Sequence, residues 1–182
     1  QIRQHLSERT DLEIIFASEA DTLLETGGGI KNVLEYFGNE PFFVCNADVL
    51  WLNGPSPVLE RMQNSWHDEQ MDGLLMLHST AEAYGYLGNG DFELDSVGKL
   101  SRKLERELTP YLFTGVQILH PRIFKGTPSG AFSLNMIYDK LIKTDRLYGI
   151  LNDGEWFHIG TPDGLDQAEK YMQYRYSGVR HR

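Results

Sequence analysis

Three stretches of the chain place polar side chains or bare backbone where a ligand can bind. In "ETGGGIKNVLEYFG" (residues 25–38), Glu25 and Thr26 precede three glycines, Gly27–Gly29, and the pattern predicts a loop followed by a helix. Glycine has no Cβ, so the backbone N–H groups of such a loop can approach a base, a ribose or a phosphate. The stretch matches neither a P-loop nor the spaced dinucleotide fingerprint. A tight strand-to-helix turn is the alternative interpretation, because glycine is a common turn residue.

The second stretch is "FFVCNADVLW", in which Asn46 and Asp48 follow an apolar run. Open α/β sheets bind ligands beyond the carboxyl ends of their strands. A carboxylate there can hold Mg²⁺ against substrate phosphates, and the Asn46 amide can bond a ribose or sugar hydroxyl. The alternative is a strand that ends in an Asx turn. Cys45 lies in the same run, is expected to be buried, and is therefore not expected to be an activated thiolate.

The third stretch is "EWFHIGTPDG", where His158 alternates with Phe157 and Ile159 and so faces the opposite side of its strand. His158 is a candidate metal ligand, or a donor to a phosphate, across the sheet from Asp48. A structural histidine at a strand end is the alternative. The other histidines show no metal-ligand spacing, and the chain has no G-x-S-x-G nucleophile elbow.

Alternating strand and helix patterns position these stretches. The expected helices cover residues 2–9, 30–37, 56–66, 134–143 and 161–174, and the expected strands cover 12–17, 41–48, 73–78, two short segments within 84–100, 111–121, 146–151 and 155–160. Within the strand expected at 41–48, residues 41–45 are continuously apolar and do not alternate with polar residues, as in buried parallel strands. The order predicts an α/β fold, a three-layer sandwich around a mixed, mostly parallel sheet.

Composition excludes several other classes of protein. The chain has 182 residues, 41% hydrophobic and 24% charged, which is typical of a globular domain, and no apolar run reaches the length of a membrane span. A net charge of −9 argues against a nucleic acid partner, because neutralising phosphates needs clustered Lys and Arg. One cysteine cannot form an intramolecular disulfide, and the first residues show no secretory signal. A cytoplasmic location is therefore expected.

Four stretches together, "LLETGGGI", "FFVCNADVLW", "YLFTGVQILHP" and "WFHIGTP", resemble the sugar-phosphate nucleotidyltransferases, or NDP-sugar pyrophosphorylases, in order and rough spacing. The resemblance covers almost the whole chain. It is greatest to the bacterial subgroup of muramate-phosphate uridylyltransferases and mannose-phosphate guanylyltransferase-like proteins. It implies a Rossmann-like nucleotide-diphospho-sugar transferase fold. It also implies a reaction in which a sugar 1-phosphate attacks the α-phosphorus of UTP or GTP, and pyrophosphate leaves.

The resemblance implies roles for residues at each end of the expected site. Gly27–Gly29, with Glu25, Thr26 and Asn46, match the segments that contact the nucleobase and ribose. Asp48 matches the aspartate that binds Mg²⁺, which holds both anions and offsets developing charge. We therefore expect a flat base to lie on the glycine segment, where no side chains intervene.

The resemblance also implies a sugar pocket. Thr114 and Gly115 match the strand that lines it, and Gly85 or Gly88 matches the glycine that contacts the sugar. His158 is a departure, because the family often has Asp there. A neutral imidazole suits Mn²⁺ or Zn²⁺ better than Mg²⁺, so His158 is expected either as a weaker metal ligand or as a donor to phosphate.

A second departure lies at the front of the chain. The family's opening strand and its glycine-rich loop, whose Arg and Lys hold the triphosphate, have no match here. Residues 1–182 are therefore expected to form one domain that lacks its first βα unit, of roughly 30 residues or more, beside the strand ending at Asp48. Two other functions stay open: a GT-A-type glycosyltransferase that uses a nucleotide-sugar, and a non-catalytic nucleotide-binding module.

Overall fold

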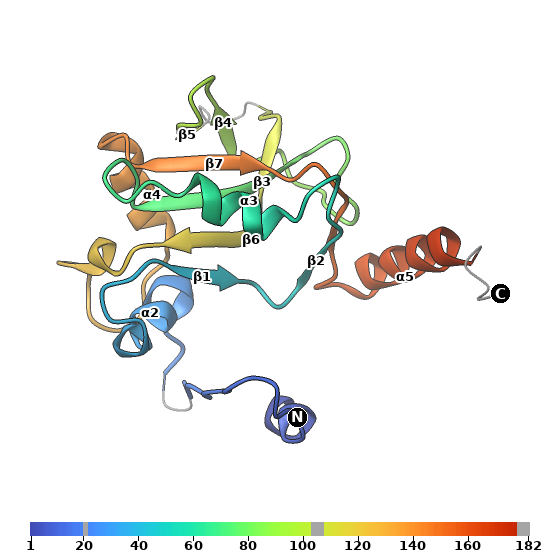
Figure 1. The fold of residues 1–182 in the computed structure, drawn as a ribbon, viewed down its shortest axis with the longest axis horizontal. Coiled ribbons are helices and arrows are strands. Elements are labelled where there is room, and N and C mark those ends of the chain that lie inside the picture. Colours follow the sequence, from blue (N-terminus) through green and yellow to red (C-terminus); the bar gives the residue numbers. More distant parts are fainter. Residues whose placement is uncertain (20–21, 103–107, 178–182) are drawn as a thin grey trace.

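The computed structural model describes residues 1–19, 22–102 and 108–177. Its centre is a six-stranded sheet in the order β5-β4-β6-β3-β7, with β1 also paired to β6 (Figure 1). The strands are β1 (Phe42–Cys45), β3 (Gly73–Ser79), β4 (Phe92–Leu94), β5 (Leu100–Arg102), β6 (Tyr111–Leu119) and β7 (Leu147–Leu151). A separate antiparallel pair is formed by β2 (Val49–Trp51) and β8 (Trp156–His158).

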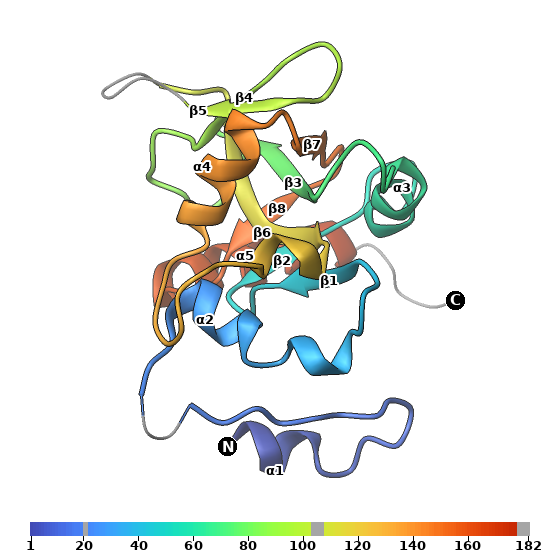
Figure 2. The same ribbon diagram turned by 90° about the vertical axis from the view of Figure 1, so that its left-hand side faces the viewer.

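Helices cover both faces of the sheet. The helices are α1 (Ile2–Leu6), α2 (Glu25–Lys31), α3 (Val58–Ser65), α4 (Asn135–Lys143) and α5 (Pro162–Tyr176), with 3₁₀ turns η1 (Leu34–Tyr36) and η2 (Pro121–Phe124). Of these, α1 and α5 lie away from the sheet (Figure 1). Figure 2 shows α3 on one side of the sheet and α2 and α4 on the other. Among the described residues, no helix is long and apolar enough to cross a membrane.

Strand β3 divides the hydrophobic core into two halves. Leu74 and Met76 belong to the core cluster that contains α3, whereas Leu75 and Leu77 belong to the cluster that contains α4. Successive side chains of a strand point to opposite faces, so a strand covered on both faces is apolar throughout. The expected three-layer arrangement is the one observed.

The sheet is mixed, as expected, but the prediction that it is mostly parallel is wrong. Among the named strands of the described residues, β3 and β7 form the only parallel pair, and β6 runs antiparallel to β1, β3 and β4. Strands β1, β3 and β7 do run in one direction, but β6 separates β1 from β3. A continuous apolar sequence indicates that a strand is buried on both faces. Helices on both faces of a sheet bury antiparallel strands in the same way as parallel ones, so the sequence pattern does not reveal strand direction.

Most expected elements are present within a few residues. The N-cap of α5 is the predicted one, because the Thr161 hydroxyl accepts a hydrogen bond from the Gly164 N–H over 3.1 Å. The strand predicted at 12–17 is wrong, since that run has no regular secondary structure, and Leu12 and Ile15 are exposed. A β-branched run forms a strand only when it pairs with another strand, and residues 12–17 pair with no strand of the described residues.

Strand β1 differs from its expected setting as well. It pairs with β6 on one side, and no described residue pairs with its other edge. Phe43 is 39% exposed and Cys45 is exposed, so the prediction that this run is fully buried, including Cys45, is wrong. The outer edge of β1 therefore offers unpaired backbone N–H and C=O groups.

The glycine segment is helical, and the prediction of a loop before a helix at 30–37 is wrong. Helix α2 begins at Glu25 and ends at Lys31, so it contains all three glycines of Gly27–Gly29. The N–H groups of Gly27 and Gly28 both donate to the Phe132 carbonyl, over 2.8 and 3.2 Å. These contacts hold the segment in a helical conformation that glycine by itself disfavours.

Candidate functional site

Two adjoining cavities lie beyond the end of β1. The first, called here the α2 cavity, measures about 460 Å³ and lies between α2, β1, β6 and the start of α4. The second, called the β8 cavity, measures about 400 Å³ and lies between β6, β8 and the segment after β3. Asn46 and Phe113 line both, so the two cavities meet at these side chains.

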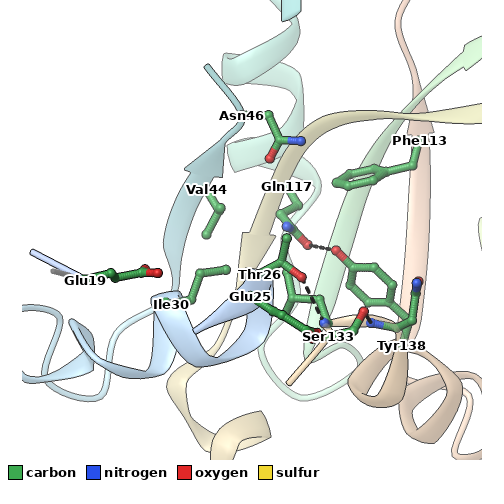
Figure 3. A pocket seen from close by; sticks show the side chains of 13 residues that line it. Glu19, Glu25, Thr26, Ile30, Val44, Asn46, Phe113, Gln117, Ser133 and Tyr138 are labelled. Atoms are coloured by element: carbon green, nitrogen blue, oxygen red, sulfur yellow. Dashed lines mark hydrogen bonds between the residues drawn. The ribbon is translucent and has the colours of Figure 1, made fainter. Parts of the chain in front are cut away.

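The α2 cavity collects most of the residues predicted to bind the nucleoside (Figure 3). Glu25, Thr26, Gly29 and Asn46 line it, although they come from two elements separated in sequence. The Thr26 hydroxyl also accepts a hydrogen bond from the Leu134 N–H over 3.1 Å, which ties α2 to the segment before α4. The residues that the sequence singled out for nucleoside binding therefore lie along one wall of a cavity in the structure.

Gly27 and Gly28 lie outside this cavity, on the buried side of α2. A Cβ on Gly28 would collide with the Gly130 carbonyl oxygen, and one on Gly27 would collide with Phe132. These two glycines allow the helix to lie against the backbone of residues 130–132. Of the three glycines, Gly29 is the one in position to contact a ligand.

The β8 cavity brings together the residues predicted for the metal and the sugar phosphate. Asp48, Gly85, Thr114, Gly115 and His158 all line it. Gly88 is not among the described residues that line either cavity, so of the two glycine candidates the geometry places Gly85 at the site.

Asp48 and His158 face each other across the β2–β8 pair. Val49 is paired with His158, which places the residue before Val49 next to the imidazole. The Asp48 carboxylate oxygen Oδ2 lies 3.6 Å from His158 Nε2, and the Ile159 N–H donates to the Asp48 carbonyl over 2.9 Å. Both side chains keep contact with solvent, at 54% and 33% exposure. Residues 110 positions apart in sequence thus form one polar pair.

Asp48 and His158 are of side-chain types that can bind metal ions, but the two alone do not make a complete metal site. No group of three or more His, Cys, Asp or Glu side chains arranged to hold a metal occurs among the described residues. Mg²⁺ in substrate-phosphate sites is commonly held by one or two carboxylates, with phosphate oxygens and waters completing its coordination. One carboxylate and one imidazole fit that type of site, and the imidazole also suits Mn²⁺.

Gly115 shapes the junction between the cavities. Its φ of +85° is one that side-chain-bearing residues rarely adopt, and the pairing of β3 with β6 shifts register beside it. The Asn46 N–H donates to the Gly115 carbonyl over 2.8 Å, and a Cβ on Gly115 would lie 2.9 Å from the Asn46 Cβ. The missing side chain therefore lets Asn46 approach β6 closely.

Thr114 is fully buried, and its polar groups are used within the fold. Its hydroxyl donates to the Met76 carbonyl over 2.8 Å, and its own carbonyl accepts from the Trp156 Nε1–H over 3.0 Å. Thr114 thus joins β3, β6 and β8 behind the cavity wall.

Sequence reasoning missed a polar pair in the α2 cavity. Gln117 and Tyr138 both line the cavity and are only 1% and 3% exposed. The Tyr138 hydroxyl donates to Gln117 Oε1 over 2.7 Å, and burial raises the pKa of Tyr138, so the hydroxyl keeps its proton. The available signal was a glutamine inside the apolar run "GVQIL", because a buried polar side chain in a strand calls for a specific partner.

No lysine or arginine is among the described residues that line the two cavities. Binding a polyphosphate here would therefore depend on a metal ion, on backbone N–H groups or on cationic groups from another segment.

Two curated proteins are similar to the chain. It is 36% identical over 156 residues to the N-acetylmuramate alpha-1-phosphate uridylyltransferase of Caulobacter vibrioides, covering 86% of this chain and 64% of that protein. It is 29% identical over 161 residues to the protein of the same name from Neisseria meningitidis serogroup B, covering 87% of this chain and 66% of that protein. The chain thus spans just under two thirds of the length of both relatives. No family model matches the chain.

Solved structures share the fold. HddC from Yersinia pseudotuberculosis, complexed with GMP-PN, superimposes with a TM-score of 0.70 at 23% identity, covering 93% of this chain and 73% of that one. A UDP-glucose pyrophosphorylase complexed with UDP-glucose superimposes with a TM-score of 0.68 at 19% identity, covering 85% of this chain and 64% of that one.

Proposed function

We propose that the chain belongs to the sugar-phosphate nucleotidyltransferase family and that its protein transfers a nucleotidyl group from a nucleoside triphosphate to a sugar 1-phosphate. Pyrophosphate is released and an NDP-sugar is formed. The observation that carries the proposal is the 36% identity to a uridylyltransferase over 86% of the chain. UTP and N-acetylmuramate 1-phosphate are therefore the first substrates to test, with GTP as the second nucleotide.

The division of the site into two cavities supports this reaction. A nucleoside in the α2 cavity and a sugar phosphate in the β8 cavity would meet near Asn46 and Phe113, which line both. Asp48 and His158 lie in the β8 cavity, where the phosphates of the two substrates would converge. Holding two reactants in this way lowers the entropic cost of their reaction.

Asp48 and His158 are the residues that would hold a divalent cation, Mg²⁺ or Mn²⁺. When bound, such an ion offsets the charge of the phosphates and of the developing transition state. The Asn46 side chain, at the junction, would orient the ribose or sugar hydroxyls. Gly29 and Thr26 would form the surface on which the nucleoside lies.

We also propose that residues 1–182 form a single domain whose sheet is completed by a further strand on the outer edge of β1. That edge is unpaired among the described residues, and Phe43 beside it is 39% exposed. A cationic loop carried by such a segment would supply the positive charge that the described residues lining the cavities lack. The cytoplasm, where nucleoside triphosphates are available, is the proposed location.

Pyrophosphate release tests the proposal directly. The protein as its gene encodes it is assayed with UTP or GTP, with N-acetylmuramate, glucose or mannose 1-phosphate, and with Mg²⁺ or Mn²⁺. We expect release only when nucleotide, sugar phosphate and metal are all present. Sugar transfer from an NDP-sugar without pyrophosphate would indicate the glycosyltransferase. Nucleotide binding without turnover in any combination would indicate the non-catalytic module.

A further inference from the structure

The Gln117–Tyr138 pair gives the α2 cavity a polar group of defined direction. Both side chains are almost completely buried, on β6 and α4 respectively, and a single hydrogen bond joins them. The Tyr138 hydroxyl has no other acceptor among the described residues, and burial favours its protonated form. Its proton must therefore go to Gln117 Oε1.

This hydrogen bond fixes the orientation of the Gln117 amide. Turning the amide around would place its N–H groups against the Tyr138 hydroxyl and leave the hydroxyl proton buried without an acceptor. With Oε1 engaged by Tyr138, the group left for a ligand is the amide nitrogen Nε2. Figure 3 shows this nitrogen turned away from Tyr138, on the side of the labelled Ile30 and Val44.

The amide nitrogen has no hydrogen-bond partner among the described residues, and it is not one of the fully buried atoms that lack a partner, so it opens onto the cavity although Gln117 as a whole is only 1% exposed. Ile30, Val44 and Phe113 provide apolar walls around the same cavity. Before a ligand enters, only water in the cavity can accept from this donor, and a ligand that displaces the water must bring an acceptor in its place.

We propose that Gln117, positioned by Tyr138, determines specificity by donating to a carbonyl oxygen of the substrate part that occupies the α2 cavity. The inference rests on the proposed function and names a feature of the substrate. Because the proposed function places the nucleoside in this cavity, the carbonyl is assigned to a keto base such as uracil or guanine; the acetamido group of an N-acylated sugar phosphate is the alternative source that the experiment separates. In an analogue with an amino group at that position, the amino N–H would meet the Gln117 N–H, and two hydrogen-bond donors cannot bond to each other. Sites built on such a hydrogen bond reject mismatched analogues by on the order of 10²-fold or more.

Two sets of substrate comparisons separate the two sources of the carbonyl. In the first arm, kcat/KM is measured for UTP against CTP and for GTP against ATP, with the sugar phosphate held constant. In the second arm, an N-acetylated hexosamine 1-phosphate is compared with its free-amine counterpart, with the nucleotide held constant. We expect discrimination by Gln117 to appear in the first arm, and discrimination in the second arm alone would overturn the assignment of the carbonyl to the base.

Two variants test the role of the pair. Gln117→Met keeps the length of the side chain and removes the donor, and it should reduce discrimination at least tenfold in the responsive arm. Tyr138→Phe keeps the ring and frees the amide to turn, so it should raise kcat/KM for the amino substrate while activity on the carbonyl substrate is largely retained. A merely structural role would not produce that asymmetry. Gln63→Leu and Tyr36→Phe, at exposed positions, are the matched controls.

Three outcomes overturn the inference or its premise. Unchanged discrimination in both arms, in folded variants that still turn over, would show that the pair only supports the core. Equal loss of activity on both members of each substrate pair would do the same. Absence of pyrophosphate release from the unsubstituted protein with every substrate would instead refute the proposed function. If Gln117→Met does not fold, Tyr138→Phe alone decides.

Discussion

At the scale of single residues, the proposed metal site consists of Asp48 and His158. Neither stretch that contains them is distinctive alone, but their side chains lie 3.6 Å apart across the β2–β8 pair. A carboxylate and an imidazole that lie close together beside a cavity, both accessible to solvent, can bind the same ligand. It also makes the two substitutions below informative, because each changes a single ligand type.

Asp48→Asn should lower metal-dependent turnover by on the order of 10² or more, because the substitution keeps size and removes the charge that balances the cation. Pyrophosphate release under saturating metal measures it. Asp166→Asn, at an exposed position on α5, is the control and should leave turnover unchanged. Equal turnover in Asp48→Asn and in the unsubstituted protein would remove Asp48 from the metal site.

His158→Asp should shift metal preference toward Mg²⁺. The substitution converts a mixed oxygen and nitrogen donor pair into two carboxylates, which harder cations prefer. The ratio of turnover in Mg²⁺ to that in Mn²⁺ should rise by on the order of tenfold. If turnover is instead lost in both metals, His158 acts as a hydrogen-bond donor to phosphate and not as a ligand.

At the scale of elements, α2 shows how tertiary contact can override local preference. Glycine-rich sequence normally opposes a helix, by about 1 kcal/mol per glycine relative to alanine. Here the absence of side chains is what permits the helix to lie on residues 130–132, where the Phe132 carbonyl accepts two N–H groups. The packing thereby also places Gly29 and Thr26 along the cavity wall.

Gly28→Ala should therefore destabilise the protein, although alanine is the better helix former. Its Cβ would collide with the Gly130 carbonyl oxygen, a backbone atom that cannot rotate away. We expect a loss of roughly 1–3 kcal/mol in the free energy of unfolding, measured by urea denaturation. Gly29→Ala is the matched control, because its Cβ would meet only the mobile end of Glu19, at 2.7 Å. Equal stability of the two variants would contradict this account of α2.

At the scale of the whole molecule, an ion-pair cluster ties together the strands on the side away from the site. Asp72, just before β3, accepts hydrogen bonds from Arg122, after β6, and from Arg146, just before β7. Arg122 also bonds the Asp68 carbonyl over 2.6 Å. Burial disfavours the charge on Asp72, but the two guanidinium groups outweigh it, and the pKa of Asp72 is lowered.

Asp72→Asn should lower the free energy of unfolding at about pH 7 by roughly 3 kcal/mol, the lower end for breaking a buried ion pair. Because the folded-state pKa lies below the unfolded one, this stabilisation is present above about pH 4 and is lost as the pH falls through the folded value. The difference between the variant and the unsubstituted protein should therefore shrink in acid. Urea denaturation at several pH values measures it.

Asp145→Asn is the control for that series. Asp145 also pairs with a basic residue, Lys99, over 3.0 Å, but its side chain is 72% exposed. Solvent screens such a pair, so little change is expected at any pH. A pH-independent effect of Asp72→Asn would show that its packing, and not its charge, stabilises the sheet.

Local patterns alone determined the α/β class, the order of most elements, and the stretches around Asn46, Asp48 and His158. These features depend on residues close in sequence: the apolar run of β3, the Thr161 cap of α5, and polar residues directly after apolar runs. Hydrophobic periodicity and capping chemistry act over a few residues, so a single sequence contains them.

Only the tertiary structure decided which strands are neighbours, why Gly27 and Gly28 lie within a helix, and that Gln117 meets Tyr138. The antiparallel placement of β6, the 3.6 Å approach of Asp48 to His158 and the division into two cavities depend on contacts between distant segments. Apolar residues indicate that a segment is buried, but they do not indicate which segment packs beside it or in which direction that neighbour runs. Such pairings depend on the packing of the whole chain. The sequence therefore indicates the candidate residues, whereas their arrangement in space requires the tertiary structure.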